Sequence, residues 1–153
     1  MKKVLMGISV TLLLAACGTT TTNQATTAQT PQTTQTPHVE VKIDGTYTVK
    51  EYDFDSNGKD IYARAFVPDV EGRVPLVIFS HGLGANARHE EEVQKALAKA
   101  GIAVFSLEFA GGSSSAAPMS EGLTTEMSVL TEVQNLKDAI RIASGMEYTD
   151  PQK

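Results

Sequence analysis

The chain has 153 residues, a formal net charge of −5 and a mean hydropathy of −0.13. The acidic balance argues against a nucleic-acid partner, because binding to a phosphate backbone depends on an excess of Lys and Arg. The chain holds a single cysteine, so it cannot form a disulfide within itself.

Residues 1–16 have the pattern of a secretory signal peptide. Lys2 and Lys3 form a short basic region, and the apolar residues 4–14 that follow are too few to span a bilayer as a helix. The next residues resemble the lipobox of bacterial lipoproteins, in which the cysteine becomes the lipidated N-terminus: Leu14, Ala15, Ala16 and Cys17. We therefore predict an exported protein, attached to the bacterial cell membrane through Cys17 and facing away from the cytoplasm. The alternative is an ordinary signal peptide followed by a chance cysteine.

Residues 17–38 form the predicted tether between this anchor and a globular domain. Between Gly18 and Pro37 the sequence consists almost only of Thr, Gln, Ala, Asn and Pro, without charge or apolar periodicity, so it cannot bury a core. A flexible segment of about twenty residues has a root-mean-square reach of roughly 25 Å. The predicted domain is then 39–153, which is small for an α/β enzyme.

The domain begins with a predicted antiparallel hairpin. Residues 47–54 and 60–67 alternate in character and are rich in strand formers, and a turn sequence, Ser56 to Lys59 with Asn57–Gly58 at its centre, separates them. In the second strand the small and aliphatic residues are expected on one face: Ile61, Ala63, Ala65 and Val67.

A strand, a helix and a second strand follow the hairpin. The run from Pro75 to Phe79 has no polar residue and predicts a strand buried on both faces. Asn86 is expected to cap a helix that carries acidic residues in its first turns and ends before Gly101. Residues 102–107 are again apolar, and a strand–helix–strand unit of this kind predicts a parallel pair.

The last predicted elements are a loop over 111–117 and a helix over 128–144. The apolar face of this helix is expected to contain Val129, Leu130, Val133, Leu136, Ile140 and Ala143. The order of elements, β-β-β-α-β-α, predicts an α/β fold that forms the opening half of a doubly wound sheet.

The candidate site is the turn after the strand 76–79. Gly82 and Gly84 permit a sharp turn there, and a backbone N–H beyond the carboxyl end of a strand is where acyl-transfer enzymes hold the oxyanion of a tetrahedral intermediate. We predict that Leu83 offers this N–H and that His81, Gly82 and Gly84 shape the turn. The alternative is an ordinary tight turn between a strand and a helix.

No catalytic triad is expected among these residues. The sequence contains no Gly-x-Ser-x-Gly, and residues 111–115 lack the final glycine of that pattern. Ser80 and His81 are adjacent and would point to opposite faces of a strand, so they cannot act as nucleophile and base. His81 is predicted to bond nearby backbone instead. His38, in the tether, and His89 lack partners at ligand spacing, so we predict neither a metal site nor a cofactor.

The order of these motifs resembles the first half of an α/β-hydrolase, and most closely the bacterial cinnamoyl (feruloyl) esterases and serine hydrolases of the dienelactone-hydrolase type. The resemblance rests on the His81–Gly84 turn, the acidic helix, the segment 106–112 and the helix that includes 129–132, and it covers 60–153. It implies an oxyanion contact from the Leu83 N–H. It also implies that a further strand and the nucleophile would follow shortly after Lys153, and that the chain is truncated before its triad.

Two classes of function follow from these observations. In the first, the chain is the N-terminal part of a lipid-anchored serine hydrolase whose full-length parent acts on a small-molecule ester. In the second, it is a non-catalytic surface lipoprotein that acts as a binding or interaction module. In either case, a strand 76–79 without its neighbour would be an open apolar edge, so self-association is expected there.

Overall fold

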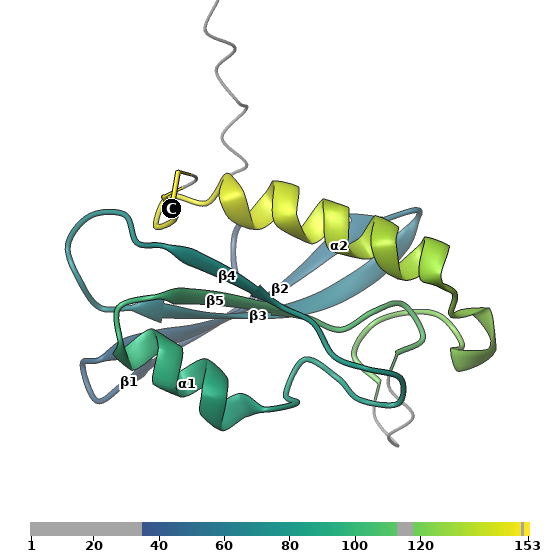
Figure 1. The fold of residues 1–153 in the computed structure, drawn as a ribbon, viewed down its shortest axis with the longest axis horizontal. Helices are drawn as coiled ribbons and strands as arrows, with labels where there is room; N and C mark the ends of the chain where they lie inside the picture. Colours follow the sequence, from purple (N-terminus) through teal and green to yellow (C-terminus); the bar gives the residue numbers. More distant parts are fainter. Residues whose placement is uncertain (1–34, 113–117, 151) are drawn as a thin grey trace, which may run out of the picture.

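The computed structural model describes residues 35–112, 118–150 and 152–153. These residues form one sheet in the order β1-β2-β3-β5-β4, with helix α1 on one face and helix α2 on the other (Figure 1). β4 and β5 are parallel and the other neighbours are antiparallel, which confirms the predicted α/β fold class. The elements are β1 (Val39–Ile43), β2 (Tyr47–Ser56), β3 (Lys59–Pro68), β4 (Leu76–Phe79), α1 (Glu91–Lys99), β5 (Ala103–Leu107), the 3₁₀ helix η1 (Thr124–Glu126) and α2 (Val129–Ser144).

The predicted hairpin is confirmed as β2 and β3. Asn57 and Gly58 form its two-residue turn with φ values of 56° and 72°, the left-handed conformation that such a turn requires. β3 is buried on both faces: its small and aliphatic residues pack in the core under α2, and Phe66 packs in a second core under α1. Successive side chains of β3 therefore point alternately into two separate hydrophobic cores, one on each face of the sheet.

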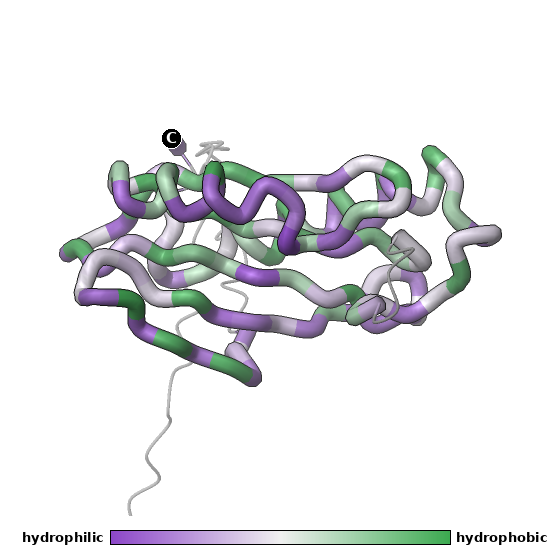
Figure 2. Tube along the Cα trace, turned by 90° about the horizontal axis from the view of Figure 1, so that it is seen from below, coloured by the Kyte–Doolittle hydropathy of each residue, from purple (hydrophilic) through white to green (hydrophobic). Residues whose placement is uncertain are grey.

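Strand β1 was not predicted. Val39, Val41 and Ile43 alternate with Glu40 and Lys42, and Figure 2 shows this alternation along the outermost strand of the sheet. The strand pairs with β2, and the ladder extends one residue further, because the backbone N–H of His38 donates to the Glu51 carbonyl at 2.9 Å. His38, which we expected in the tether, is thus bonded to the sheet.

Helix α1 begins later than predicted. It starts at Glu91, preceded by Glu90 in a left-handed conformation with φ 54°. Asn86 does not cap this helix, because its side-chain oxygen accepts the N–H of Arg88 at 2.9 Å and so closes a local turn. The amide of Gln94, buried in the helix, fastens that turn by donating to the His89 carbonyl at 2.7 Å.

The predicted apolar face of α2 is largely wrong. Val129 and Leu130 are 73% and 83% exposed, and the residues buried against the sheet are Asn135, Ala139, Ile142 and Ala143. The reason is a pair of polar contacts. Asn135 and Asp138 hydrogen-bond to Ser56 in β2, and these bonds turn the polar Asn135 toward the sheet in place of the most hydrophobic face of the helix.

Strand β4 lies at one edge of the sheet, so its residues are only partly buried, contrary to the prediction of burial on both faces. Leu76 and Ile78 pack against the core under α2, while the outer side of the strand has no neighbouring strand along 76–79 among the described residues. A bare apolar edge of this kind is a template for pairing with another chain.

We expect residues 35–153, expressed alone, to be marginally stable and to self-associate through β4. Val77→Lys should shift the population toward monomer, because a charge on an edge strand opposes pairing. Size-exclusion chromatography with light scattering measures this, and Val41→Lys on β1, the opposite edge, is the matched control. A wild-type monomer with a cooperative thermal transition at an ordinary mesophile temperature would contradict the prediction.

Candidate active site

The turn after β4 carries Leu83, the residue predicted to offer an oxyanion N–H. The N–H of Ala85 donates to the Gly82 carbonyl at 3.1 Å, and Gly84 has φ 78°, so the chain reverses tightly here. Leu83 lies at the tip, 79% exposed, and its own N–H meets no acceptor among the described residues. The four residues predicted for this turn therefore lie in one tight reversal of the chain, with Leu83 exposed at its tip.

His81 fixes the base of this turn. His81 is 7% exposed. Its Nδ1 lies 2.8 Å from the Gly82 carbonyl oxygen, and its Nε2 accepts a hydrogen bond from the backbone N–H of Phe109 at 3.0 Å. A carbonyl oxygen can only accept and a backbone N–H can only donate, so the ring is neutral and carries its proton on Nδ1. The backbone-bonding role predicted for His81 is thus what the geometry shows, and the ring also contacts Phe109, at 5.1 Å between centroids.

Through His81 the turn after β4 is joined to the loop after β5. This loop needs its two glycines: a Cβ on Gly112 would lie 2.6 Å from Cε1 of His81, and one on Gly111 would overlap the Leu123 carbonyl. Sequence reasoning treated this glycine pair only as part of a flexible loop. Gly111 instead allows the backbone at Leu123 to approach closely, and Gly112 leaves room for the His81 ring.

Glu108 holds the other end of the same loop. The buried carboxylate accepts the backbone N–H of Met119 at 2.8 Å and that of Ser120 at 3.1 Å through the same oxygen. The Ser120 hydroxyl in turn donates to the Glu108 carbonyl at 2.6 Å. The Glu108 carboxylate therefore has a structural role. The serines at 113–115 lie outside the described residues, as does Cys17.

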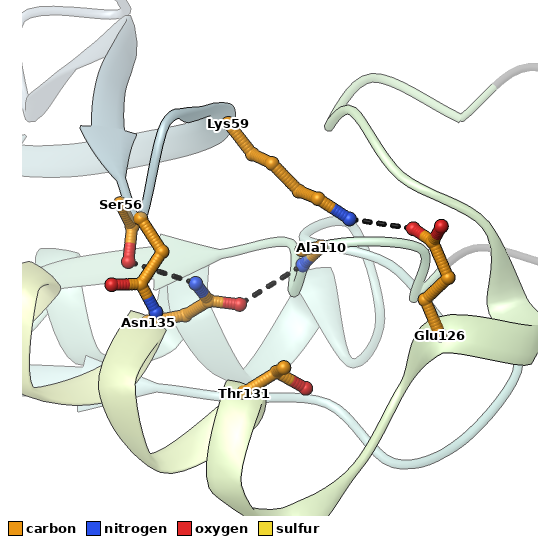
Figure 3. Close-up of a pocket in the computed structure, with 7 residues that line it drawn as sticks. Ser56, Lys59, Ala110, Glu126, Thr131 and Asn135 are labelled. Carbon is orange, nitrogen blue, oxygen red and sulfur yellow. Dashed lines mark hydrogen bonds and ion pairs between the residues drawn. The ribbon is translucent and has the colours of Figure 1, made fainter.

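A small polar pocket of about 40 Å³ lies beside Ala110 (Figure 3). Asn135 bridges it, accepting the Ala110 N–H at 3.1 Å and donating to Ser56 Oγ at 2.9 Å. The Ser56 hydroxyl donates to Asp138 at 2.8 Å, so this serine is committed to structural bonds and has no histidine base. Asn135 was missed in the sequence, although a polar residue at the centre of an amphipathic helix was the available signal.

Two carboxylates near the pocket are held ionised. The hydrogen bond from Lys59 Nζ, 2.6 Å from Glu126, lowers the pKa of the Glu126 carboxyl. Burial opposes ionisation of Asp138, but hydrogen bonds from Gln134, Ser56 and Arg141 outweigh it and lower the pKa of Asp138.

The remaining histidines have ordinary surroundings. His38 is partly exposed with Nδ1 3.4 Å from Asp53, and His89 lies exposed beside Glu90. Within the described ranges, no group of three or more His, Cys, Asp or Glu side chains could hold a metal ion. In the same part of the chain, no helix is both long and apolar enough to cross a membrane.

Comparison with solved structures finds the same fold in several proteins described as esterases or thioesterases. The chain superposes on acetyl xylan esterase 1 from Thermoanaerobacterium with a TM-score of 0.58 and 16% identity, covering 75% of this chain and 42% of that one. It superposes on a cold-adapted esterase from an Arctic intertidal metagenomic library with a TM-score of 0.55 and 12% identity, covering 70% of this chain and 48% of that one. The thioesterase domain of the curacin biosynthetic pathway superposes with a TM-score of 0.51 and 22% identity, covering 61% of this chain and 31% of that one.

No family model matches the sequence, and no curated protein matches it. At these identities the solved structures show the fold alone, and the chain spans less than half the length of each of the three. The described residues therefore have the α/β-hydrolase fold over a part of its extent.

We expect His81→Phe to destabilise the domain by about 1–3 kcal/mol, because it fills the same space but leaves the buried Phe109 N–H without an acceptor. Urea unfolding measures the change. Leu83→Ala, at the exposed tip of the same turn, should stay within about 0.5 kcal/mol of wild type. In the wild type, ¹⁵N shifts of the His81 ring should show a protonated Nδ1 and a bare Nε2; the opposite tautomer would refute the bonding scheme.

Proposed function

We propose that this chain carries the oxyanion-binding side of a lipid-anchored serine hydrolase that cleaves carboxylic esters. The observation that carries the proposal is the position of Leu83 beyond the carboxyl end of β4, where its N–H meets no acceptor among the described residues. The His81 bond to Phe109 holds this turn in place. The esterase fold of the structural neighbours supports it. The nucleophile, acid and base are supplied by residues outside these 153, since the sequence has no Gly-x-Ser-x-Gly.

The chemistry assigned to this chain is electrostatic. When a serine oxygen bonds to the acyl carbon, the carbonyl electron pair moves to oxygen, and the Leu83 N–H donates a hydrogen bond to the negative charge that develops there. A preorganised donor stabilises this charge without rearranging during the reaction. His81 acts on the substrate only indirectly, by fixing the turn that presents Leu83.

The substrate class is a small carboxylic ester. The neighbours include enzymes described as acetyl xylan esterases and a thioesterase, so esters and thioesters of short acyl groups are the first compounds to test. The resemblance of the sequence to cinnamoyl esterases adds hydroxycinnamoyl esters to this set.

The DNA that follows the Lys153 codon separates this function from the alternative of a non-catalytic binding module. A strand pattern leading into Gly-x-Ser-x-Gly, in any frame, favours the hydrolase. Sequence that lacks the motif in all frames favours the binding module.

In a product that contains this motif, Leu83→Pro should lower kcat for a p-nitrophenyl ester about 100- to 1,000-fold, because proline has no N–H to donate. Leu83→Ala keeps the N–H and should retain near-wild-type kcat. Equal losses in the two variants, at equal folding by circular dichroism, would remove Leu83 from the oxyanion role.

The 153 residues alone are the baseline for this experiment. They should show no ester turnover above a blank, since an oxyanion donor without a nucleophile gives far less than enzymatic acceleration. Turnover that disappears in Ser113→Ala, Ser114→Ala or Ser115→Ala would instead assign the nucleophile to the loop after β5.

For the anchor, we expect Cys17 to be diacylated and the mature protein to sediment with membranes, because two acyl chains give stable attachment where one is marginal. In bacteria expressing the full chain, Cys17→Ala should move the protein to the soluble exported fraction. Metabolic labelling with a fatty-acid analogue provides a second measurement. A wild-type protein that is wholly soluble and unlabelled would contradict the proposal.

A further inference from the structure

The apolar side of β1 is only partly covered. Val39, Val41 and Ile43 alternate with charged residues, a pattern typical of a strand with one buried face. Val39 is nevertheless 39% exposed and Val41 48% exposed. On this face of the sheet, α1 packs mainly over β3 and β5 (Figure 1). The described residues therefore leave the apolar side of β1 open to an occupant.

This open side of β1 forms part of the floor of a groove of about 320 Å³ that runs beside α1. The strand register arranges the floor in rows across β1 and β2. Val41 is paired with Val49 and Ile43 with Tyr47, so these two rows of the floor are entirely apolar. The third row differs, because Val39 is paired with a charged residue, Glu51. The groove is thus apolar over most of its length and polar at one end.

The charges at the polar end are already paired with one another. Glu51 in β2 is directly paired with Arg64 in β3, with 3.4 Å between Oε1 and Nε. From α1, Glu91 lies 2.8 Å from Nη1 of Arg64 and 3.2 Å from Nζ of Lys95. Two cations and two anions therefore line this end of the groove.

This balance favours an uncharged ligand. The next charged neighbours, Arg88 beside Glu51 and Glu92 beside Lys95, add one charge of each sign. A charged ligand would have to compete with these pairs for its counter-ion, at a cost in desolvation. A neutral oxygen needs only a donor. The Lys95 ammonium has three N–H groups and contacts two carboxylates, so one N–H remains for a ligand oxygen.

The dimensions of the groove limit the occupant to a small, elongated molecule. One turn of a helix, about 10 Å across and about 5.4 Å long, fills roughly 400 Å³ and exceeds the groove. A strand cannot pair there, because the groove lies on the face of the sheet and not along its hydrogen-bonding edge. From Val39 to Ile43 the floor extends about 14 Å, the length of an extended aliphatic chain of about eight to ten carbons.

We propose that the groove between β1 and α1 binds a single aliphatic chain of medium length that carries an uncharged hydroxyl or ester head. The chain lies over Val41 and Ile43, and the head oxygen accepts a hydrogen bond from Lys95. β1 and β4 are at opposite edges of the sheet, so this site is separate from the turn after β4 and does not depend on the proposed function.

The test titrates the full chain with 1-octanol and follows the backbone amide signals by NMR. The chain carries Cys17→Ala, so that no attached lipid competes for the groove. We expect saturable shifts in β1, at 47–51 and at 91–95. 1-Hexanol, which is two methylenes shorter, should have a Kd about 5- to 15-fold higher, since each buried methylene contributes up to about fourfold. Sodium octanoate should bind at least about tenfold more weakly than 1-octanol, because its charge has no free counter-ion.

Matched variants of β1 separate the groove from the rest of the surface. Val41→Gln places an amide in the apolar floor and should raise the Kd for 1-octanol at least about tenfold. Lys42→Gln makes the same side chain on the opposite face of the same strand and should leave the Kd unchanged. Circular dichroism checks that both variants are folded.

A third variant tests the charge balance. Glu91→Gln removes one anion from the polar end, so octanoate should gain about tenfold in affinity relative to 1-octanol. This shift in preference is not expected from a general loosening of the domain, which would weaken both ligands.

Four results would overturn the proposal. They are the absence of saturable shifts in the groove, equal effects of Val41→Gln and Lys42→Gln, octanoate binding as tightly as 1-octanol in the wild type, and a dimer that only Val41→Gln dissociates. The last would identify a second copy of the chain as the occupant. Each readout is independent of ester hydrolysis, so failure here leaves the proposed function standing.

Discussion

The parallel pairing of β4 with β5 is the constraint on which the candidate site depends. Parallel strands have their carboxyl ends on the same side of the sheet, so the turn after Phe79 and the loop after Leu107 lie next to each other. The bond from Phe109 to His81 fixes that meeting in one geometry. Without this pairing, His81 would not accept the buried N–H of Phe109, and the position of Leu83 would not be fixed.

Polar groups, more than apolar ones, set how the second layer lies on the sheet. Asn135 links Ala110 to Ser56, and Asp138 holds the same serine from the neighbouring turn of α2. A buried polar group that lost its partner would cost about 1–3 kcal/mol, so these bonds favour the orientation of α2 in which Asn135 faces the sheet. On the opposite face, Arg64 ties α1 to the sheet through Glu91 at 2.8 Å.

Local patterns predicted much of this fold. The Asn57–Gly58 turn, the two parallel strands and the start of α2 to within one residue follow from short-range chemistry, and the α/β class is confirmed. Features that depend on distant partners were missed. The α2 face required knowledge of Ser56, and the start of α1 required knowing that Asn86 would bond Arg88. For the site, His81, Gly82, Leu83 and Gly84 were predicted from the motif. The tautomer of His81 follows only from its bond with Phe109, and the need for Gly112 follows only from the His81 ring beside it.

The two edges of the sheet differ in a way that assigns them different roles. β1 carries Glu40 and Lys42 on an exposed strand, and charged side chains on an edge oppose pairing with another chain. β4 carries only Leu76, Val77, Ile78 and Phe79, the composition of a strand with neighbours on both sides. β1 is thus built as a true edge, while β4 has the sequence of an interior strand. Just before β4, Val74 forms an isolated parallel bridge with Thr149 on this side of the sheet.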